Sequence, residues 1–220
     1  MCGRFSTPDE ELVIKKFGLK LPDGYRRSFN VAPTQPVLTM VSKKELQLHR
    51  WGLIPSWAKD SSIGNKMINA RAETVAEKPA FRKPFAKRRC LVLAAGFYEW
   101  QRLNDTKRPH YIYAYDGDLI TFAGIWDEWK IPEGELVRSA CIITTAANDF
   151  IKPIHDRMPV VIRSEELDEW LNPDADPVKL TRLLRSPPDG FLKAHSVSKF
   201  VNHPRNDSEK CIEPESIATG

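Results

Sequence analysis

The stretch CLVLAAGFYEWQ, residues 90–101, contains two short apolar runs that follow each other closely. Cys90 to Ala95 and Phe97 to Gln101 are rich in apolar and aromatic side chains, and Gly96 separates them. Short runs of this composition that are bounded by turn residues are typical of β-strands. The stretch therefore predicts two consecutive strands.

Six further runs of the same character lie on either side of this stretch. They are Val37 to Val41, Leu46 to Trp51, His110 to Tyr115, Leu119 to Trp126, Ala140 to Ala146 and Val160 to Ile162. Asp116 and Gly117 stand between two of these runs and predict a tight β-hairpin. Because the strands do not alternate regularly with helices, we predict an α+β fold with a curved, barrel-like, mostly antiparallel sheet flanked by short helices.

Three segments carry helix signals. Thr7, Pro8 and Glu10 form a capping-box pattern, which predicts a helix from about Pro8 to Phe17. Two later helices are expected, one capped by Ser164 and running to Leu171, the other capped by Asp176 with Pro177 at its first position.

Length and composition indicate one intracellular domain over residues 1–220. The 220 residues contain no Gly/Ser linker, and no apolar run approaches the roughly 20 residues of a membrane span. The amino terminus lacks the features of a signal peptide, so we expect a cytoplasmic protein. The four cysteines have neither zinc-ligand nor disulfide-framework spacing, so no metal and no cofactor is predicted, and Cys90 and Cys141 are expected in the core.

The charges are distributed unevenly along the chain. Residues 1–110 hold 21 Lys and Arg against 10 Asp and Glu, whereas residues 111–220 hold 12 against 19. Such asymmetry often marks a face that meets phosphate groups. We interpret the densest basic stretch, Lys78 to Arg89, as a solvated surface that steers an anionic partner rather than as a specific site.

Cys2 follows the initiator methionine, so removal of Met1 would place an α-amine and a thiol on one residue. An α-amine has a pKa of about 7.7–8.0 and is partly unprotonated at neutral pH. A 1,2-aminothiol captures aldehydes, because the amine forms an imine and the thiol then closes a five-membered thiazolidine. The alternative is that a cysteine is simply tolerated at the second position.

Two further polar pairs have chemical potential. Asn69 and Arg71 are two residues apart, so on an extended segment they point to the same side and could hold a nucleophile and a phosphate. His155 is suited to proton transfer near neutral pH, and Arg157 supplies a second phosphate-binding fork. An ordinary Asn/Arg loop pair and a structural histidine are the respective alternatives.

Glu99 lies between Tyr98 and Trp100 in an otherwise apolar strand. If its side chain faces inward, burial should raise its pKa toward the range that a general acid or base needs. Strand alternation offers the opposite interpretation, in which Glu99 faces water.

These residues carry a resemblance to a known family. The motifs MCGRF, FNVAP, WGLIPSW, INARAET, AAGFYEW, TTAAN with IHDRMP, and VSKFVNHPRND occur in the order and approximate spacing of the SRAP family, the SOS response-associated peptidases. The match extends from Cys2 to about Pro214, which is essentially the whole chain.

The resemblance implies a protein that senses abasic sites in single-stranded DNA and links itself to them covalently. It implies that Cys2 is the nucleophile, that Asn69 positions it, and that Glu99 and His155 supply acid and base groups. The DNA-binding residues that it implies are Arg4, Asn30, Arg71, Thr145 and Arg157, with Pro33, Trp57 and Met67 wedged or stacked beside the lesion. Met1 must be removed first, by an aminopeptidase or by self-processing, and lyase activity is expected when ring closure fails.

Two other functions stay open on the sequence alone. One is a thiol peptidase in which Cys2 attacks and His155 is the base. The other is a non-covalent reader of single-stranded or modified DNA. We expect a bacterial monomer without membrane or metal partners that associates with the nucleoid when bound to DNA; the sequence names no protein partner.

Overall fold

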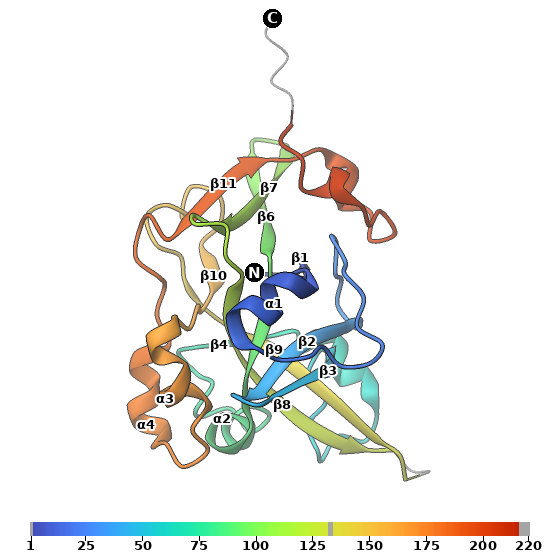
Figure 1. Ribbon diagram of the computed structural model, residues 1–220, viewed down its shortest axis with the longest axis vertical. Coiled ribbons are helices and arrows are strands. Elements are labelled where there is room, and N and C mark those ends of the chain that lie inside the picture. Colours follow the sequence, from blue (N-terminus) through green and yellow to red (C-terminus); the bar gives the residue numbers. More distant parts are fainter. Residues whose placement is uncertain (1, 132–133, 216–220) are drawn as a thin grey trace, which may run out of the picture.

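The computed structural model describes residues 2–131 and 134–215 and contains two β-sheets (Figure 1). One has the strand order β1-β6-β7-β11, and the other β10-β9-β3-β2-β5-β8, with β4 added on β9. The strands are β1 (Phe5–Ser6), β2 (Pro36–Ser42), β3 (Glu45–Trp51), β4 (Asn69–Arg71), β5 (Arg89–Ala94), β6 (Gly96–Leu103), β7 (Thr106–Ala114), β8 (Ile120–Lys130), β9 (Leu136–Ala146), β10 (Arg157–Pro159) and β11 (Leu192–Ser196).

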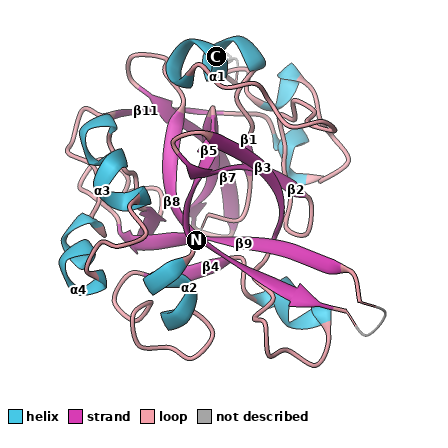
Figure 2. Cartoon of the chain, turned by 60° about the horizontal axis from the view of Figure 1, so that its bottom comes forward, coloured by secondary structure: helices cyan, strands magenta, loops and turns pink. Residues whose placement is uncertain are grey.

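The larger sheet closes into a barrel because β8 pairs with both β5 and β9 (Figure 2). The closed path runs β9-β3-β2-β5-β8 and back to β9. The pairs that β9 makes with β3 and β4 are parallel, and the other pairs are antiparallel. The prediction of an α+β fold with a barrel-like, mostly antiparallel sheet is therefore confirmed.

Within residues 90–101 the chain passes from one sheet to the other. β5 belongs to the barrel and β6 to the four-stranded sheet, with only Ala95 between them. At Gly96 a Cβ atom would lie 2.5 Å from the Tyr111 hydroxyl and 2.7 Å from the Ile112 carbonyl oxygen. Only glycine fits where the two sheets meet so closely.

The hairpin predicted at Asp116 and Gly117 is wrong. The turn itself forms, since the Gly117 N–H donates to the Ala114 carbonyl at 3.1 Å and Gly117 has φ of +77°. However, β7 pairs with β6 and β11, whereas β8 pairs with β5 and β9. Turn residues determine a local chain reversal, but burial of the flanking apolar faces selects the partner strand.

Short helices flank the sheets. They are α1 (Glu10–Phe17), α2 (Arg82–Lys87), α3 (Leu167–Leu171) and α4 (Pro177–Leu180). Asp176 caps α4 as predicted, and its side chain accepts from Val178 N. The predicted capping box at Thr7 is wrong: Asp9 caps α1, and the Thr7 hydroxyl is bonded to the backbone of Ser28.

Other boundaries differ from the prediction. The segment after Arg163 begins with a 3-10 turn, Ser164–Glu166, and becomes α-helical only in α3. The run from Val160 to Ile162 is not a strand, because the short strand β10 precedes it and Val161 forms only an isolated bridge to Phe122. Strands β1 and β11 were not predicted.

Strand β6 has apolar packing on both faces. Phe97 belongs to a buried cluster that contains Cys2 and Trp51, whereas Tyr98 belongs to another that contains Val201 and Cys211. The second cluster is built on the segment after β11, which folds back over the sheet. Side chains on both faces of the first half of β6, from Gly96 to Glu99, are consequently shielded from water.

Within the described part of the chain, no helix combines the length and apolar character that crossing a membrane requires.

Candidate functional site

Cys2 lies at the centre of the candidate site. Its side chain is fully buried, and its carbonyl oxygen accepts a 2.7 Å hydrogen bond from Asn69 Nδ2. The pairing of Phe5 with Phe97 then aligns the amino-terminal segment along β6. Burial raises the pKa of the Cys2 thiol, and the Glu99 carboxylate raises it further, against a hydrogen bond from the Arg4 backbone.

Glu99 is buried, with 3% of its surface exposed, so the interpretation in which it faces water is wrong. Alternation fails here because β6 is covered on both faces. Burial raises the pKa of Glu99 to about 7 from an ordinary value near 4.5. The carboxyl group can therefore both donate and accept a proton near neutral pH.

His155 lies beside Glu99, with its Nε2 atom 3.8 Å from Glu99 Oε2. Its Nδ1 atom accepts a 2.9 Å hydrogen bond from the Arg157 backbone N–H, which places the ring proton on Nε2, facing Glu99. The exposed Asp156 carboxylate is also 2.9 Å from Nδ1. Because burial lowers the pKa of His155 more than Asp156 raises it, the neutral ring is favoured.

Asn69 also lines a groove of about 530 Å³, so it links this groove to Cys2. The extended strand β4 buries Ala70 and turns Asn69 and Arg71 toward the groove, as their spacing predicted. The groove is lined by Trp57, Lys66, Met67, Asn69, Arg71, Thr74, Lys78, Pro79, Ala80 and Phe81. Trp57 is 59% exposed, which is unusual for an indole that has no role in binding.

Arg157 and Thr145 lie on neighbouring strands next to β4. Arg71 is in register with Thr144 of β9, while Thr145 pairs with Met158 in β10. The Arg157 guanidinium donates to both oxygens of Glu73 and, at 2.6 Å, to the Thr144 carbonyl. Thr145 is buried.

Arg4 and Asn30 belong to a buried network. Arg4 Nη1 donates to Asn30 Oδ1 at 2.8 Å and to the Val201 carbonyl at 3.1 Å. Asn30 is 1% exposed, and its Nδ2 donates to carbonyls of Val201, His203 and Asn206. The expectation that the Asn30 side chain contacts DNA does not agree with this position, in which it anchors the carboxy-terminal segment.

Pro33 lies in the turn between residues 32 and 35, where it is half-buried and is not among the residues that line the groove. The structure thus brings together Cys2, Asn69, Glu99 and His155. It joins Trp57, Met67 and Arg71 to this group through the groove.

Sequence reasoning missed several residues of this region. Glu73 stands inside the INARAET motif, and its charge opposite Arg157 was the available signal. Lys78 belongs to the stretch interpreted as a solvated surface, yet it lines the groove. In the same stretch Arg89 is buried and donates to backbone carbonyls of Phe85 and Trp170, so its role is structural.

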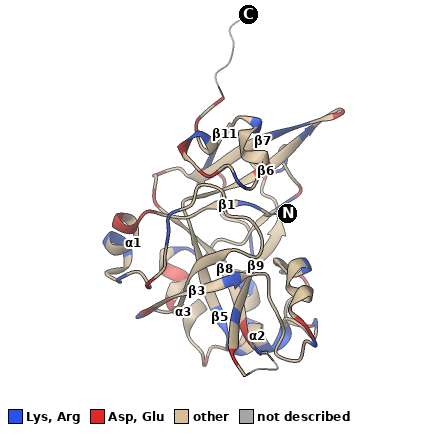
Figure 3. Ribbon diagram, turned by 90° about the vertical axis from the view of Figure 1, so that its right-hand side faces the viewer, with Lys and Arg blue, Asp and Glu red and all other residues tan. Residues whose placement is uncertain are grey.

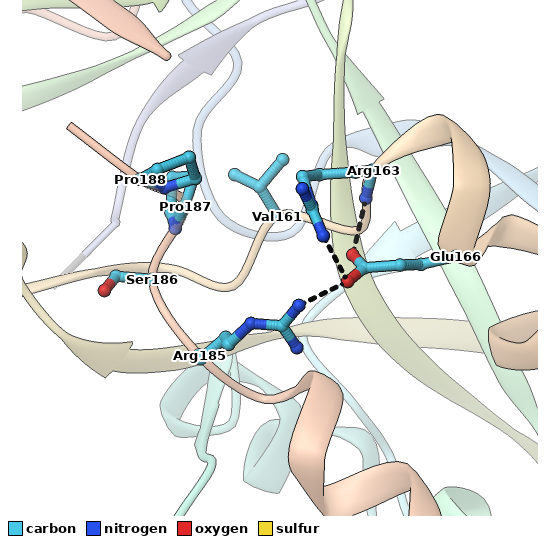
Figure 4. A pocket seen from close by; sticks show the side chains of 7 residues that line it. All are labelled: Val161, Arg163, Glu166, Arg185, Ser186, Pro187 and Pro188. Carbon is cyan, nitrogen blue, oxygen red and sulfur yellow. Dashed lines mark hydrogen bonds and ion pairs between the residues drawn. The ribbon is translucent and has the colours of Figure 1, made fainter. Parts of the chain in front are cut away.

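A second depression lies elsewhere, where Glu166 points toward Arg163 and Arg185 (Figure 4). Glu166 Oε1 accepts from both guanidinium groups, at 3.1 and 2.6 Å. These charges compensate one another, so we assign no ligand there. Among residues 2–131 and 134–215, no cluster of three His, Cys, Asp or Glu side chains has an arrangement suited to a metal ion.

The chain is similar to proteins of one family. A family model described as SOS response associated peptidase (SRAP) matches residues 1–204. The abasic site processing protein YoqW of Bacillus subtilis is 47% identical, over 97% of this chain and 99% of that protein. The abasic site processing protein HMCES of Gallus gallus is 34% identical, over 86% of this chain and 67% of that protein.

The fold is also present among solved structures. A crystal structure of a protein from Bacteroides thetaiotaomicron superposes with a TM-score of 0.89 at 29% identity, covering 97% of this chain and 100% of that one. The whole-chain match of the family model and the similarity to YoqW lead to one conclusion. The chain belongs to the SRAP family.

Proposed function

We propose that the protein senses abasic sites in single-stranded DNA and forms a thiazolidine crosslink to them through Cys2 after removal of Met1. The relatives named abasic site processing proteins support this substrate class. The observation that carries the proposal is the position of Asn69, which holds the Cys2 carbonyl and lines the groove. A strand in this groove would bring its sugar to Cys2.

The first step opens the deoxyribose ring. Glu99, with a pKa of about 7, is partly protonated at neutral pH and donates a proton to the ring oxygen. The C1′ hydroxyl gives its proton to the Glu99 carboxylate formed by this transfer, the C1′–O4′ bond breaks, an aldehyde forms and the carboxyl group is protonated again. His155, whose Nε2–H faces Glu99, stabilises the carboxylate between the two proton transfers.

The α-amine of Cys2 then adds to C1′, and loss of one water gives the imine. The thiol adds to the same carbon, and its proton passes through Glu99 to the nitrogen. Because burial and Glu99 raise the pKa of the thiol, ring closure needs this nearby base. The thiazolidine removes the imine that would promote β-elimination, so lesion protection dominates and lyase activity is a side reaction.

The groove supplies affinity. Arg71 and Lys78 offer cations to the DNA backbone, and Trp57 and Met67 offer apolar surface to an unstacked base. Such a protein acts where DNA is present, which in a bacterium is the cytoplasm.

Incubation with single-stranded DNA that contains one abasic site tests the proposal. We expect a denaturant-stable adduct that is absent with intact DNA and absent for Cys2→Ala. Intact-mass measurement establishes whether Met1 is removed, which is a precondition for the adduct. If the protein without Met1 gave no adduct, or if Cys2→Ala retained it, the proposal would be wrong.

A further inference from the structure

We propose that Asp127 and Trp129 are positioning residues that hold the two walls of the groove and fix Trp57 for stacking on DNA. This inference rests on the proposed function, because it assigns the groove to single-stranded DNA. Neither residue lines the groove, and both are buried in β8 beneath it.

The backbone on both sides of Trp57 is bonded to these two residues. The N–H of Ser56 donates to Asp127 Oδ2 at 2.9 Å, and the carbonyl oxygen of Ala58 accepts from Trp129 Nε1 at 2.7 Å. Trp57 is thus an exposed indole on a backbone that is fixed immediately before and after it.

The same carboxylate reaches the opposite wall. Asp127 Oδ1 accepts from Arg88, which ends α2, and Phe81 immediately precedes that helix. The Arg88 carbonyl also accepts from Trp126 N at 2.9 Å. Asp127 is only 3% exposed, so one buried carboxylate connects the Trp57 wall to the Phe81 wall and constrains the width of the groove.

The β8–β9 pair extends beyond the barrel and supports this arrangement. β5 pairs with β8 only as far as Ile125, whereas β8 and β9 remain paired to Lys130 and Leu136 and form a projecting ribbon (Figure 2). Gly52 N donates to the Ala140 carbonyl at 2.8 Å and Ile54 N to Ser139 Oγ at 2.7 Å. The segment that precedes Trp57 therefore lies on this ribbon.

A fixed Trp57 favours binding because an aromatic group that is already ordered loses little conformational entropy when a base stacks on it. We call Asp127 and Trp129 the anchors. Loss of their hydrogen bonds should make the backbone around Trp57 more mobile and so weaken DNA binding. It should leave the reaction at Cys2 unchanged once DNA is saturating, because neither anchor belongs to the Cys2, Asn69 and Glu99 group.

Trp129→Phe tests the inference, since it removes the N–H bond to Ala58 and keeps an aromatic ring in place. The dissociation constant is measured with single-stranded DNA containing tetrahydrofuran, an abasic analogue that has no aldehyde. We expect binding about fivefold weaker, within the energy of one base–aromatic stack. The crosslinking rate at saturating abasic DNA should stay within about twofold of the parent rate.

Asp127→Asn is the second variant, because it removes the charge opposite Arg88 while keeping an oxygen that can accept from Ser56. Glu135→Gln is the matched control, since it removes one negative charge at the outer end of the same ribbon, beside the Lys130–Leu136 pair, whereas Arg88 contacts Asp127 and Glu128. The control should bind like the parent protein.

Each variant is also combined with Trp57→Ala. If the anchors act through Trp57, adding Trp129→Phe or Asp127→Asn to Trp57→Ala causes no further loss. Equal losses in both backgrounds, or unchanged binding by both anchor variants while Trp57→Ala weakens binding, would overturn the inference and leave the proposed function intact. Unchanged binding by Trp57→Ala itself would instead refute the assignment of the groove to DNA.

Discussion

Glu99 combines reactivity with a cost in stability at a single residue. The carboxyl group is buried on the face of β6 that also carries Phe97, and this burial raises its pKa to about 7. In ordinary surroundings it would be ionised at neutral pH and could not serve as an acid. The same burial makes the ionised carboxylate of Glu99 less stable in the folded state. The protonation state of Glu99 therefore affects both ring opening and the free energy of unfolding.

We predict that Glu99→Gln slows crosslinking roughly hundredfold, the usual range for loss of a general acid or base. Crosslinking requires a protonated Glu99, with a pKa of about 7, and an unprotonated Cys2 amine, with a pKa of about 7.7–8.0. The rate should therefore rise with pH to a maximum between about pH 7 and 8 and fall above it.

Single-turnover rates with abasic DNA between pH 6 and 9 test this prediction. In Glu99→Gln the descending limb above about pH 8 should disappear, and only the rise that follows deprotonation of the amine should remain. A parent profile that rises steadily across the whole range would contradict the role of Glu99 as an acid.

Glu99→Gln should also stabilise the protein at alkaline pH. The folded pKa of about 7 exceeds the ordinary value of 4.5, so the folded state binds more protons in between and stability falls as pH rises from about 4.5 to 7. Glutamine does not titrate, so the variant does not show this pH-dependent loss of stability. Its free energy of unfolding relative to the parent should therefore increase between pH 5 and pH 8, by up to roughly 3 kcal/mol.

Urea unfolding of both proteins at pH 5 and pH 8 measures this difference. Histidine titration is common to both proteins and cancels in the comparison. A difference that does not change with pH would show that the carboxyl group of Glu99 is not strained by burial.

At the scale of elements, periodicity and composition predicted most of the strands but could not predict their partners. The runs around Asp116 and Gly117 were placed correctly, yet β7 and β8 entered different sheets. β1 was missed because two residues, Phe5 and Ser6, form too short a pattern. Strand pairing depends on which apolar faces become buried against distant parts of the chain, and a local sequence pattern carries no information about those parts.

For the candidate site, too, local sequence spacing predicted some features, while others depend on distant segments of the chain. Spacing predicted that Asn69 and Arg71 share a side, because an extended segment has period two. Whether Glu99 faces inward was open, because Glu99 shares a face of β6 with Phe97, and that face is covered by a cluster that includes Cys2, about 100 residues earlier in the chain. Asn30 has the residue type of a DNA contact, but its four hydrogen-bond partners became visible only in the fold.

Asn30→Ala tests the structural role of Asn30 at this scale. Its amide joins the segment before β2 to the carboxy-terminal segment, so its loss leaves buried carbonyls without donors. We predict a decrease of about 2–4 kcal/mol in the free energy of unfolding. Asn202→Ala, which removes an exposed bond to Trp100 Nε1 in the same segment, should cost less than about 1 kcal/mol.

Urea unfolding without DNA compares the two variants. If Asn30→Ala were as stable as Asn202→Ala and yet bound DNA more weakly, the side chain would act as a DNA contact and its assignment as an anchor would be wrong.

Over the whole molecule, the basic residues in the first half of the sequence have two roles. Some form hydrogen bonds and ion pairs within the fold, and others line the groove. Arg88 and Arg89 are held by Asp127 and by backbone carbonyls, whereas Lys66, Arg71 and Lys78 line the groove. In the ribbon of Figure 3, α2 contains basic positions and α1 contains positions of both signs. The charged residues that line the groove are all basic, and the groove adjoins α2 through Phe81.

This distribution makes DNA affinity depend on salt, and Arg71 provides the test. Arg71 is exposed, and its assigned partner is a phosphate, so Arg71→Ala should weaken binding to all single-stranded sequences alike. For one lost contact, the slope of log affinity against log salt should decrease by about 0.7.

Lys179→Ala, which removes a cation from α4 outside the groove lining, should leave the slope unchanged. Titrations of tetrahydrofuran-containing DNA from low to moderate salt measure both slopes. An equal change of slope in both variants would mean that DNA responds to the net charge of the protein and not to cations at defined positions. The groove would then have no special role in binding.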